Sequence, residues 1–342
     1  MTLRRPRYPG KNPRAFHLKY KELDPSRDPA TIEKVLASGK TPAGTHRPIM
    51  VTEVLECLRP SPGETAVDCT LGGGGHAQII LDRIRPGGRL IGLDVDPIEL
   101  PRTEARLRAA GFGEYEFIAR QGNFAALPRV LAEAGVAAVD ILLADLGVSS
   151  MQLDNPARGF TWREPGPLDM RMHPTKGEPA SALLARIDEG ELERMLNEHA
   201  DEPYAELIAH LIKSHKQPIE TTNLLERTVR TGLTKAYPKL EKADVKMSVR
   251  RTFQALRIAV NDEFSVLDAL LRSLPDVLAP GGRVVFLTFH SGEDRRVKKA
   301  FQSGQRAGIY ADVAKDVIRS SMTETRENRR SSSAKLRWAI RA

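Results

Sequence analysis

Cysteines and long apolar runs are scarce in this sequence. It has two cysteines among 342 residues, Cys57 and Cys69, with no C-x-x-C motif and no histidines clustered at metal-ligand spacing. Neither a disulfide framework nor a zinc site is therefore indicated. No run approaches the roughly 18 apolar residues of a membrane-spanning helix, and no apolar signal segment follows Met1. We expect a soluble, cytoplasmic protein with no membrane partner.

The net charge of +8 is concentrated at the two ends of the chain. Residues 1–50 hold 11 Lys and Arg against 4 Asp and Glu, and residues 295–342 hold 13 against 4, so the middle carries −8. Basic ends around an acidic body suit a polyanion such as nucleic acid; the alternative is solvated tails that aid solubility. Residues 1–44, rich in Pro, Arg and Lys, predict a flexible basic arm. Prolines and few serines argue against an organelle transit peptide.

From Thr65 onward the sequence alternates between strand-like and helix-like segments. Short connections between them predict right-handed βαβ units and a parallel sheet covered on both faces. The expected strands are residues 65–71, 89–96, 114–120, 139–150, 281–291 and 335–342.

The alternation stops after the fourth expected strand. Residues 155–245 show helical patterns without a convincing strand, and one long helix is expected around residues 252–274. The predicted fold is α/β, with a doubly wound, mostly parallel sheet. Residues 45–154 and 246–342 would form this domain, and residues 155–245 an inserted helical subdomain.

Four consecutive glycines, Gly72 to Gly75, follow the first expected strand. Glycine costs about 1 kcal/mol relative to alanine in regular structure, so the run suggests a backbone that a ligand approaches closely. A Walker A phosphate loop is not indicated, because no lysine follows Gly75. The spacing Gly72, Gly74, Ala77 instead matches the G-x-G-x-x-A dinucleotide fingerprint.

Asp94 lies 22 residues beyond Gly72, at the end of the second expected strand. A carboxylate there is placed to accept hydrogen bonds from ribose hydroxyls. NAD and S-adenosylmethionine both fit this local pattern.

Residues after the third and fourth strands favour S-adenosylmethionine. Phe124, in GNF, is placed to cover an adenine ring, while Asp145 and Gln152, in DLGVSSMQLD, should reach the same carboxyl edge. A nicotinamide enzyme is expected to carry a proton-donating group near the fourth strand, and none is evident. An NAD-dependent oxidoreductase is the alternative.

Eight segments, in their order and spacing, resemble the bacterial 16S rRNA (cytosine-N4)-methyltransferase family. The likeness runs from His46 to about Phe301, and the segments are HRPIMVTEVLECL, DCTLGGGGHAQIIL, GLDVDP, ADLGVSSMQLD, RGFTW, GPLDMRM, TFQALRIAVNDE and APGGRVVFLTFHSGEDRRVK. The resemblance implies a Rossmann-like class I methyltransferase that uses S-adenosylmethionine. It also implies a target, the N4 amine of a cytidine in the decoding centre of 16S rRNA, with the small ribosomal subunit as partner. The cofactor contacts implied by motif are Gly74, Gly75, His76, Asp94, Phe124, Asp145 and Gln152.

Methylation of a cytosine amine requires hydrogen-bond acceptors and groups that position the base. A cytosine amine is a poor nucleophile, so the site must hold it in line with the methyl group at roughly 3–3.5 Å. We predict Asp145 as the catalytic acceptor, the alternative being a strand-end cap. His290 is the second predicted catalytic residue, or else a structural histidine. Arg171 and Arg257 are predicted to bind substrate; an ion pair is the alternative for each. No metal is expected.

The sequence departs from the family pattern in three places. Gly292 in HSGEDR replaces a usual leucine, HADEP at residues 199–203 replaces YGEER, and MSVRRTFQ at residues 247–254 replaces HPATRTFQ. These changes lie away from the glycine loop and bear on details that face RNA. Because of these changes a third hypothesis remains open, namely that the protein is a catalytically silent relative that binds RNA.

Overall fold

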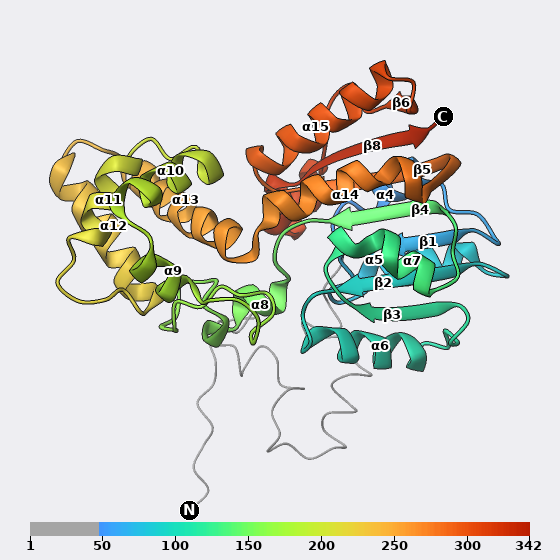
Figure 1. Cartoon of the computed structure of the whole chain (residues 1–342), viewed down its shortest axis with the longest axis horizontal. Helices are drawn as coiled ribbons and strands as arrows, with labels where there is room; N and C mark the ends of the chain where they lie inside the picture. The colour runs from blue at the N-terminus through green and yellow to red at the C-terminus, as the bar shows by residue number, and fades with distance from the viewer. Residues whose placement is uncertain (1–47) are drawn as a thin grey trace, which may run out of the picture.

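A computed structural model describes residues 48–342, so the predicted arm at residues 1–44 lies outside the described part. One sheet organises the first and last parts of this region, and a group of helices lies to one side of it (Figure 1). The strand order is β3-β2-β1-β4-β5-β8-β6, and β7 pairs with β8. The strands are β1 (Thr65–Asp68), β2 (Arg89–Asp94), β3 (Phe117–Gln121), β4 (Val139–Asp145), β5 (Leu278–Thr288), β6 (Tyr310–Val313), β7 (Ile318–Arg319) and β8 (Lys335–Arg341).

Strands β1 to β5 run parallel, whereas β6, β7 and β8 add antiparallel pairs at one side. Parallel strands buried on both faces need nearly continuous apolar runs, and β4, VDILLAD, is such a run with five of its seven residues buried. The strand order reverses between β1 and β4. Open α/β sheets bind ligands outside the carboxyl ends of the strands at such a switch point. The predicted α/β class is confirmed.

Helices cover both faces of the sheet because alternate side chains of each strand point to opposite faces. Ala66 of β1 packs in the cluster that contains residues of α4, α5 and α6, and Val67 packs in the cluster of α7, α14 and α15. The helices are α4 (Val51–Leu58), α5 (Gly75–Ile84), α6 (Glu99–Ala109), α7 (Leu127–Glu133), α14 (Glu263–Val277) and α15 (Ser291–Arg306).

A third apolar cluster belongs to the helices beside the sheet. These are α9 (Ala180–Arg186), α10 (Glu189–Ala200), α11 (Ala205–Lys213), α12 (Thr222–Ala236) and α13 (Lys242–Asn261), and we call them the helical unit. Helix α13 continues unbroken through residue 245, the predicted second boundary, and the division into subdomains stays a prediction. Short helices complete the chain: η2 (Phe124–Ala126), α8 (Ser150–Asp154), η3 (Pro156–Arg158), α16 (Met322–Glu327) and η4 (Arg329–Ser333).

The prediction of a single long helix around residues 252–274 is wrong. Two helices, α13 and α14, meet there at Asp262, which has a left-handed φ of 48°. Aspartate tolerates this conformation better than most residues. Asn261 supports the corner, since its Nδ2 donates to the carbonyl oxygens of Arg257 and Met170. Apolar spacing continues across the corner, so periodicity alone does not reveal the break.

None of the helices within residues 48–342 combines the length and apolar character that crossing a bilayer requires.

The three departures from the family pattern meet where the helical unit joins the sheet. Asp201 accepts from Ser291 Oγ at 3.1 Å and pairs with Arg295 at 2.9 Å. The buried Ser248 Oγ donates to Glu202 Oε1 at 2.8 Å. The HADEP segment therefore contacts both of the other segments directly, and part of this junction is buried rather than free to face RNA.

Gly292 is part of this junction because the ring of Phe264 fills the space beside it. A Cβ added at Gly292 would lie 2.6 Å from Phe264 Cζ. That ring also meets the His199 ring edge-on at 5.4 Å, and the Arg296 guanidinium lies over it at 3.6 Å. Leucine at position 292 would require Phe264 to move.

We expect Gly292→Leu to lower the free energy of unfolding by about 1–3 kcal/mol, as overpacking of a close-packed site does. The variant that combines it with Phe264→Ala should lose less stability than the two single changes added together, because the smaller side chain vacates the space. Urea unfolding of the four proteins measures this coupling. Strictly additive losses would show that the two positions do not compete for one volume.

Candidate active site

Three neighbouring strands end in aspartates at the carboxyl edge of the sheet. Asp68 ends β1, Asp94 ends β2 and Asp145 ends β4. Burial raises the pKa of Asp68 to about 7, that of Asp94 to about 6 and that of Asp145 to about 8. The neighbouring Asp68 carboxylate adds to the shift at Asp145. Within residues 48–342, no Lys or Arg forms an ion pair with these three acids, so the edge is short of positive charge.

The glycine loop is fixed by its neighbours on both sides. Gly72 N donates to Asp94 Oδ2 at 2.7 Å, and Asp96 N donates to Asp94 Oδ1 at 2.8 Å. From α6, Thr103 Oγ1 donates to the carbonyl of Gly72, and Arg106 donates to the carbonyl of Gly73. Each Asp94 oxygen has a second lone pair, so the carboxylate keeps room for ribose hydroxyls.

Packing explains two of the four glycines. Gly74 has a left-handed φ of 65°, and a Cβ there would lie 2.7 Å from Thr103 Cγ2; a Cβ on Gly75 would lie 3.0 Å from Pro48 Cδ. Gly73 is exposed, with nothing within 4 Å of an added Cβ. The open side of the loop is therefore at Gly73. Cofactor contact by Gly74 and Gly75 stays a prediction, carried by their backbone at the start of α5.

His76 is buried and its ring is committed to two protein groups. Nε2 lies 2.9 Å from the carbonyl oxygen of Ile49, which makes Nε2 the donor and leaves the lone pair on Nδ1. Nδ1 faces Asp145 Oδ2 at 3.7 Å. Burial lowers the pKa of His76 to about 4, so the ring is neutral at pH 7. His76 and Asp145 are thus brought together, and cofactor contact by His76 stays a prediction.

Asp145 offers a buried acceptor at this edge that no described residue uses. Its Oδ1 is buried without a hydrogen-bond partner, although its side chain as a whole is 28% exposed. Thr70 joins it to Asp68, because Thr70 Oγ1 accepts from Asp145 N at 2.7 Å and Thr70 N donates to Asp68 Oδ1 at 3.0 Å. A buried, unsatisfied carboxylate oxygen is costly unless a ligand completes it.

Gln152 is buried and both ends of its amide are occupied. Oε1 accepts from Ser149 N at 2.9 Å, and Nε2 donates to Asp96 Oδ2 at 2.8 Å. Arg158 Nη1 donates to the same Asp96 oxygen at 2.7 Å, while its Nη2 donates to the carbonyl of Met172 at 2.7 Å. Asp96 and Arg158 are not among the predicted site residues, although both stand in quoted motifs, GLDVDP and RGFTW. They bind the end of β2 to the GPLDMRM segment.

That segment lies across the edge of the sheet. Asn261 Oδ1 accepts from Met172 N at 2.7 Å, and the side chains of His173 and Gln121 meet at 3.2 Å at the end of β3. Met170 has a left-handed φ of 64°. Contacts with α13 and β3 hold the segment in place.

Both predicted substrate arginines are in ion pairs. Arg171 makes a bidentate pair with Asp169, at 2.9 and 2.7 Å, and Arg257 makes one with Glu263, at 2.7 Å for both bonds. The structure thus has the ion pair that the sequence leaves open for each. Substrate contact by either stays a prediction.

His290 follows β5 and caps α15. Its Nδ1 accepts from Glu293 N at 3.4 Å, and its Nε2 lies 3.0 Å from Glu293 Oε1. His290, Glu263 and Glu293 bring possible metal-ligating atoms within 4.8 Å of one another. The Arg257 guanidinium already pairs with Glu263 and lies 3.9 Å from Glu293, so it supplies positive charge there.

Phe124 is half-buried on η2, where it packs against the core cluster beneath α7 and α14. Its role over an adenine ring stays a prediction.

A model of the MraW methylase family matches residues 43–342. The chain belongs to this family. The match confirms the predicted recognition and extends it past Phe301 to the last residue. The chain is therefore a methyltransferase that depends on S-adenosylmethionine, and the NAD-dependent oxidoreductase is set aside.

Curated relatives agree over nearly the whole chain. Ribosomal RNA small subunit methyltransferase H 1 of Lachnoclostridium phytofermentans is 48% identical and covers 99% of this chain and 93% of its own length. Methyltransferase H 2 of Alkaliphilus metalliredigens is 47% identical, with 99% and 97% covered. Methyltransferase H of Anaeromyxobacter sp. strain K is 44% identical, with 85% and 96% covered. Coverage of 99% takes in the N-terminal arm, so the arm has counterparts in some relatives.

The carboxyl edge fits this cofactor. When bound, S-adenosylmethionine supplies an electrophilic methyl group on a positively charged sulfur. A cation suits an edge with three uncompensated acids, and Asp145 Oδ1 is an acceptor without a partner. The Gly73 side of the loop is open, and ribose contact by Asp94 stays a prediction.

The raised pKa of Asp145 predicts how stability depends on pH. Between its unfolded pKa of about 3.9 and its folded pKa of about 8, the folded protein binds the proton more tightly, so stability without cofactor falls as pH rises through this window. We expect the melting temperature to fall less steeply from pH 5 to 8 in Asp145→Asn. Asp82→Asn, an exposed change of equal charge, should keep the wild-type slope. Equal slopes for Asp145→Asn and wild type would contradict the assignment.

Asp94→Ala should weaken S-adenosylmethionine binding by about several-fold to a hundredfold, because charge-assisted hydrogen bonds are lost. Calorimetry measures the affinity, and Glu104→Ala, a half-exposed acid on α6 that pairs with Arg108, is the control. Thermal melting checks that the loop held by Asp94 stays folded. Unchanged affinity in a folded Asp94→Ala protein would show that another group holds the ribose.

Proposed function

We propose that this methyltransferase acts on small-subunit ribosomal RNA, in the cytoplasm, at the N4 amine of a cytidine. Relatives that cover 99% of the chain are named ribosomal RNA small subunit methyltransferases. The resemblance in the sequence implies the cytidine and its decoding-centre position. The observation that carries the chemistry is the unpartnered Asp145 Oδ1 at the switch point of the sheet.

An exocyclic amine needs an acceptor when it attacks a methyl group. Its lone pair is delocalised into the ring, and a hydrogen bond from its N–H to a carboxylate favours the pyramidal nitrogen that attacks. In our proposal, ionised Asp145 accepts that hydrogen bond at Oδ1 and then the proton that the nitrogen releases. A pKa of about 8 lies near the operating pH, as an efficient base requires.

His76 packs beside Asp145 in this proposal. Its ring is fixed by the Ile49 carbonyl, and its Nδ1 lone pair faces Asp145 Oδ2. At 3.7 Å the two atoms form no hydrogen bond, so the ring only fills the space beside Oδ2, and Oδ1 is left for the substrate. Since His76 is neutral, it adds no positive charge that would lower the basicity of the carboxylate.

The target base must leave its stack to reach Asp145. Enzymes that act on a base take it from a single-stranded or looped segment and extrude it into a pocket. The GPLDMRM segment, held by Arg158 and Asn261, lies beside that route. Its Met170 and Met172 backbone is fixed by hydrogen bonds rather than free to rearrange.

The hypothesis of a catalytically silent relative rests on the three departures from the family pattern. They pack against one another at the junction of α10, α13 and α15. Asp145, Asp94 and the glycine loop keep the family motifs. The departures therefore give no reason to expect loss of methyl transfer.

We expect the wild-type protein to form N4-methylcytidine in small-subunit rRNA, and Asp145→Asn to slow methyl transfer by about 10²–10³-fold, as loss of a preorganised electrostatic contact does. Nucleoside mass spectrometry of rRNA from small-subunit particles at several assembly stages measures the product. Asp82→Asn is the control and should match wild type. Absence of N4-methylcytidine from every wild-type reaction would overturn the proposal.

A further inference from the structure

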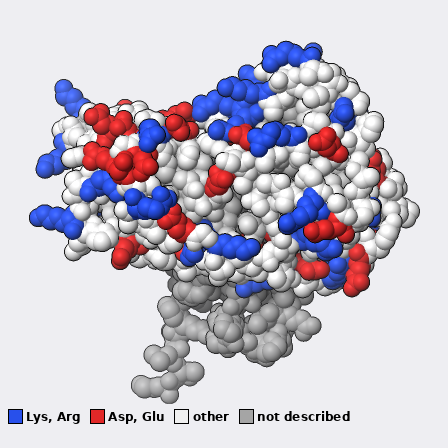
Figure 2. Space-filling view, viewed as in Figure 1, with Lys and Arg blue, Asp and Glu red and all other residues white. Residues whose placement is uncertain are grey.

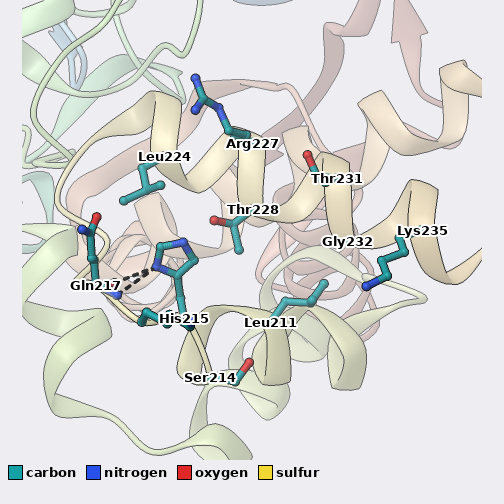
Figure 3. A pocket seen from close by; sticks show the side chains of 11 residues that line it. Leu211, Ser214, His215, Gln217, Leu224, Arg227, Thr228, Thr231, Gly232 and Lys235 are labelled. Carbon is teal, nitrogen blue, oxygen red and sulfur yellow. Dashed lines mark hydrogen bonds between the residues drawn. The ribbon is translucent and has the colours of Figure 1, made fainter.

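A groove of about 600 Å³ lies between α11 and α12, on the helical unit and outside the active site already described (Figure 3). We infer that this groove binds backbone phosphates of the RNA substrate, at a second site separate from methyl transfer. The inference rests on the proposed function, because RNA is the polyanion that the enzyme would then meet.

The groove offers cations and hydroxyl donors, and no acid lines it. Its charged residues are Lys216, Arg227 and Lys235, and its hydroxyl groups include Thr228. Figure 3 shows Thr228 and the ring of His215 facing each other across the groove. Lys and Arg neutralise phosphates, and threonine hydroxyls commonly add hydrogen bonds to phosphate oxygens.

The cations of the groove have no carboxylate partner among the described residues, unlike the neighbouring Arg230. Within residues 48–342, Lys216, Arg227 and Lys235 form no ion pair. Arg230, only three residues after Arg227, pairs with Glu226 at 2.8 Å. Positive charge that no carboxylate satisfies is available to an anionic ligand.

Close helix packing builds the floor of the groove. A Cβ at Gly232 would overlap Leu211 Cδ1, so glycine at this position lets the Leu211 side chain pack directly on α12. Leu211 and Leu224 line the groove together with its cations. A groove lined by both leucines and cations suits a sugar-phosphate segment, because its phosphates are charged and its sugar carbons are apolar.

Basic and acidic residues lie on different sides of the helical unit. Residues 213–250 contain nine Lys and Arg against four Asp and Glu, whereas α10 contains four Glu against one Arg. Figure 2 shows acidic side chains gathered over α10 and basic side chains projecting at the outer edge of the unit. A polyanion is therefore favoured at the edge and repelled at α10.

Exposed groups continue the cationic surface past the groove. Lys239, Lys242 and Lys246 are exposed beyond Lys235, and Tyr237 is 45% exposed. Aromatic rings beside unpaired cations are typical of surfaces that bind single-stranded RNA, where bases stack on the rings.

The test compares two charge-matched double variants of the full chain. One removes groove cations, Arg227→Gln with Lys235→Gln. The control removes two exposed arginines from α5 and α7, Arg83→Gln with Arg129→Gln. Affinity for a transcribed small-subunit rRNA fragment is measured across a salt series, together with S-adenosylmethionine affinity.

The groove variant should bind the RNA about tenfold more weakly at low salt, and its plot of log affinity against log salt should be shallower by about 1 to 2. Its S-adenosylmethionine affinity should equal that of wild type, and the control should bind RNA nearly as wild type does. Groove and control variants that bind RNA alike would overturn the inference.

Two further outcomes separate this inference from the proposed function. If wild type methylates rRNA but the groove variant binds and methylates like the control, the groove inference alone fails. If the groove variant keeps its affinity for naked rRNA and loses it only for assembled particles, the groove binds an acidic protein surface, and the RNA inference is overturned. If wild type neither binds nor methylates rRNA, the proposed function itself fails.

Discussion

Uncompensated negative charge at the carboxyl edge is the constraint on which the rest of the site depends. Asp68, Asp94 and Asp145 come together because parallel strands end side by side, and burial then raises the pKa of each. Without a cation the charged form of these acids is disfavoured, since buried carboxylates lose hydration that a few backbone N–H donors replace only in part. A positively charged cofactor offsets this loss. Binding energy and pH dependence thus arise from one arrangement of three acids.

The same edge also fixes the part of the chain that would face the substrate. Asp96, two residues beyond Asp94, holds Gln152 and Arg158, and Arg158 holds the carbonyl of Met172. These are buried, charge-assisted bonds, which are stronger and more directional than neutral ones. A displacement of the segment after β2 would therefore move the GPLDMRM segment as well. Cofactor site and substrate route are joined by side chains rather than merely adjacent.

The sequence predicts the sheet well because parallel strands buried on both faces are unbroken apolar runs, and Asp94 and Asp145 are recognisable as acids that end such runs. Asp68 is missed, since it stands inside the run TAVDCTL and the strand ends at Asp68 rather than at Leu71. Asp96 and Arg158 are 62 residues apart in sequence, and no local pattern pairs them. The corner at Asp262 is hidden by apolar spacing that continues through it. Strands β6 and β7 are only four and two residues long, too short for a periodic signal.

Helix α13 connects two places where we expect RNA to bind, the lysine-rich outer edge of the helical unit and the active site. It begins at Lys242, beside the exposed lysines of the outer edge, and ends at Asn261, which bonds to Met170 and Met172 at the active site. Twenty helical residues span about 30 Å, and a packed helix of this length does not bend easily. A mononucleotide fills only one of the two places. A folded RNA that reaches both gains phosphate contacts at the outer edge while its target base enters the active site, so a large structured RNA is favoured over a mononucleotide.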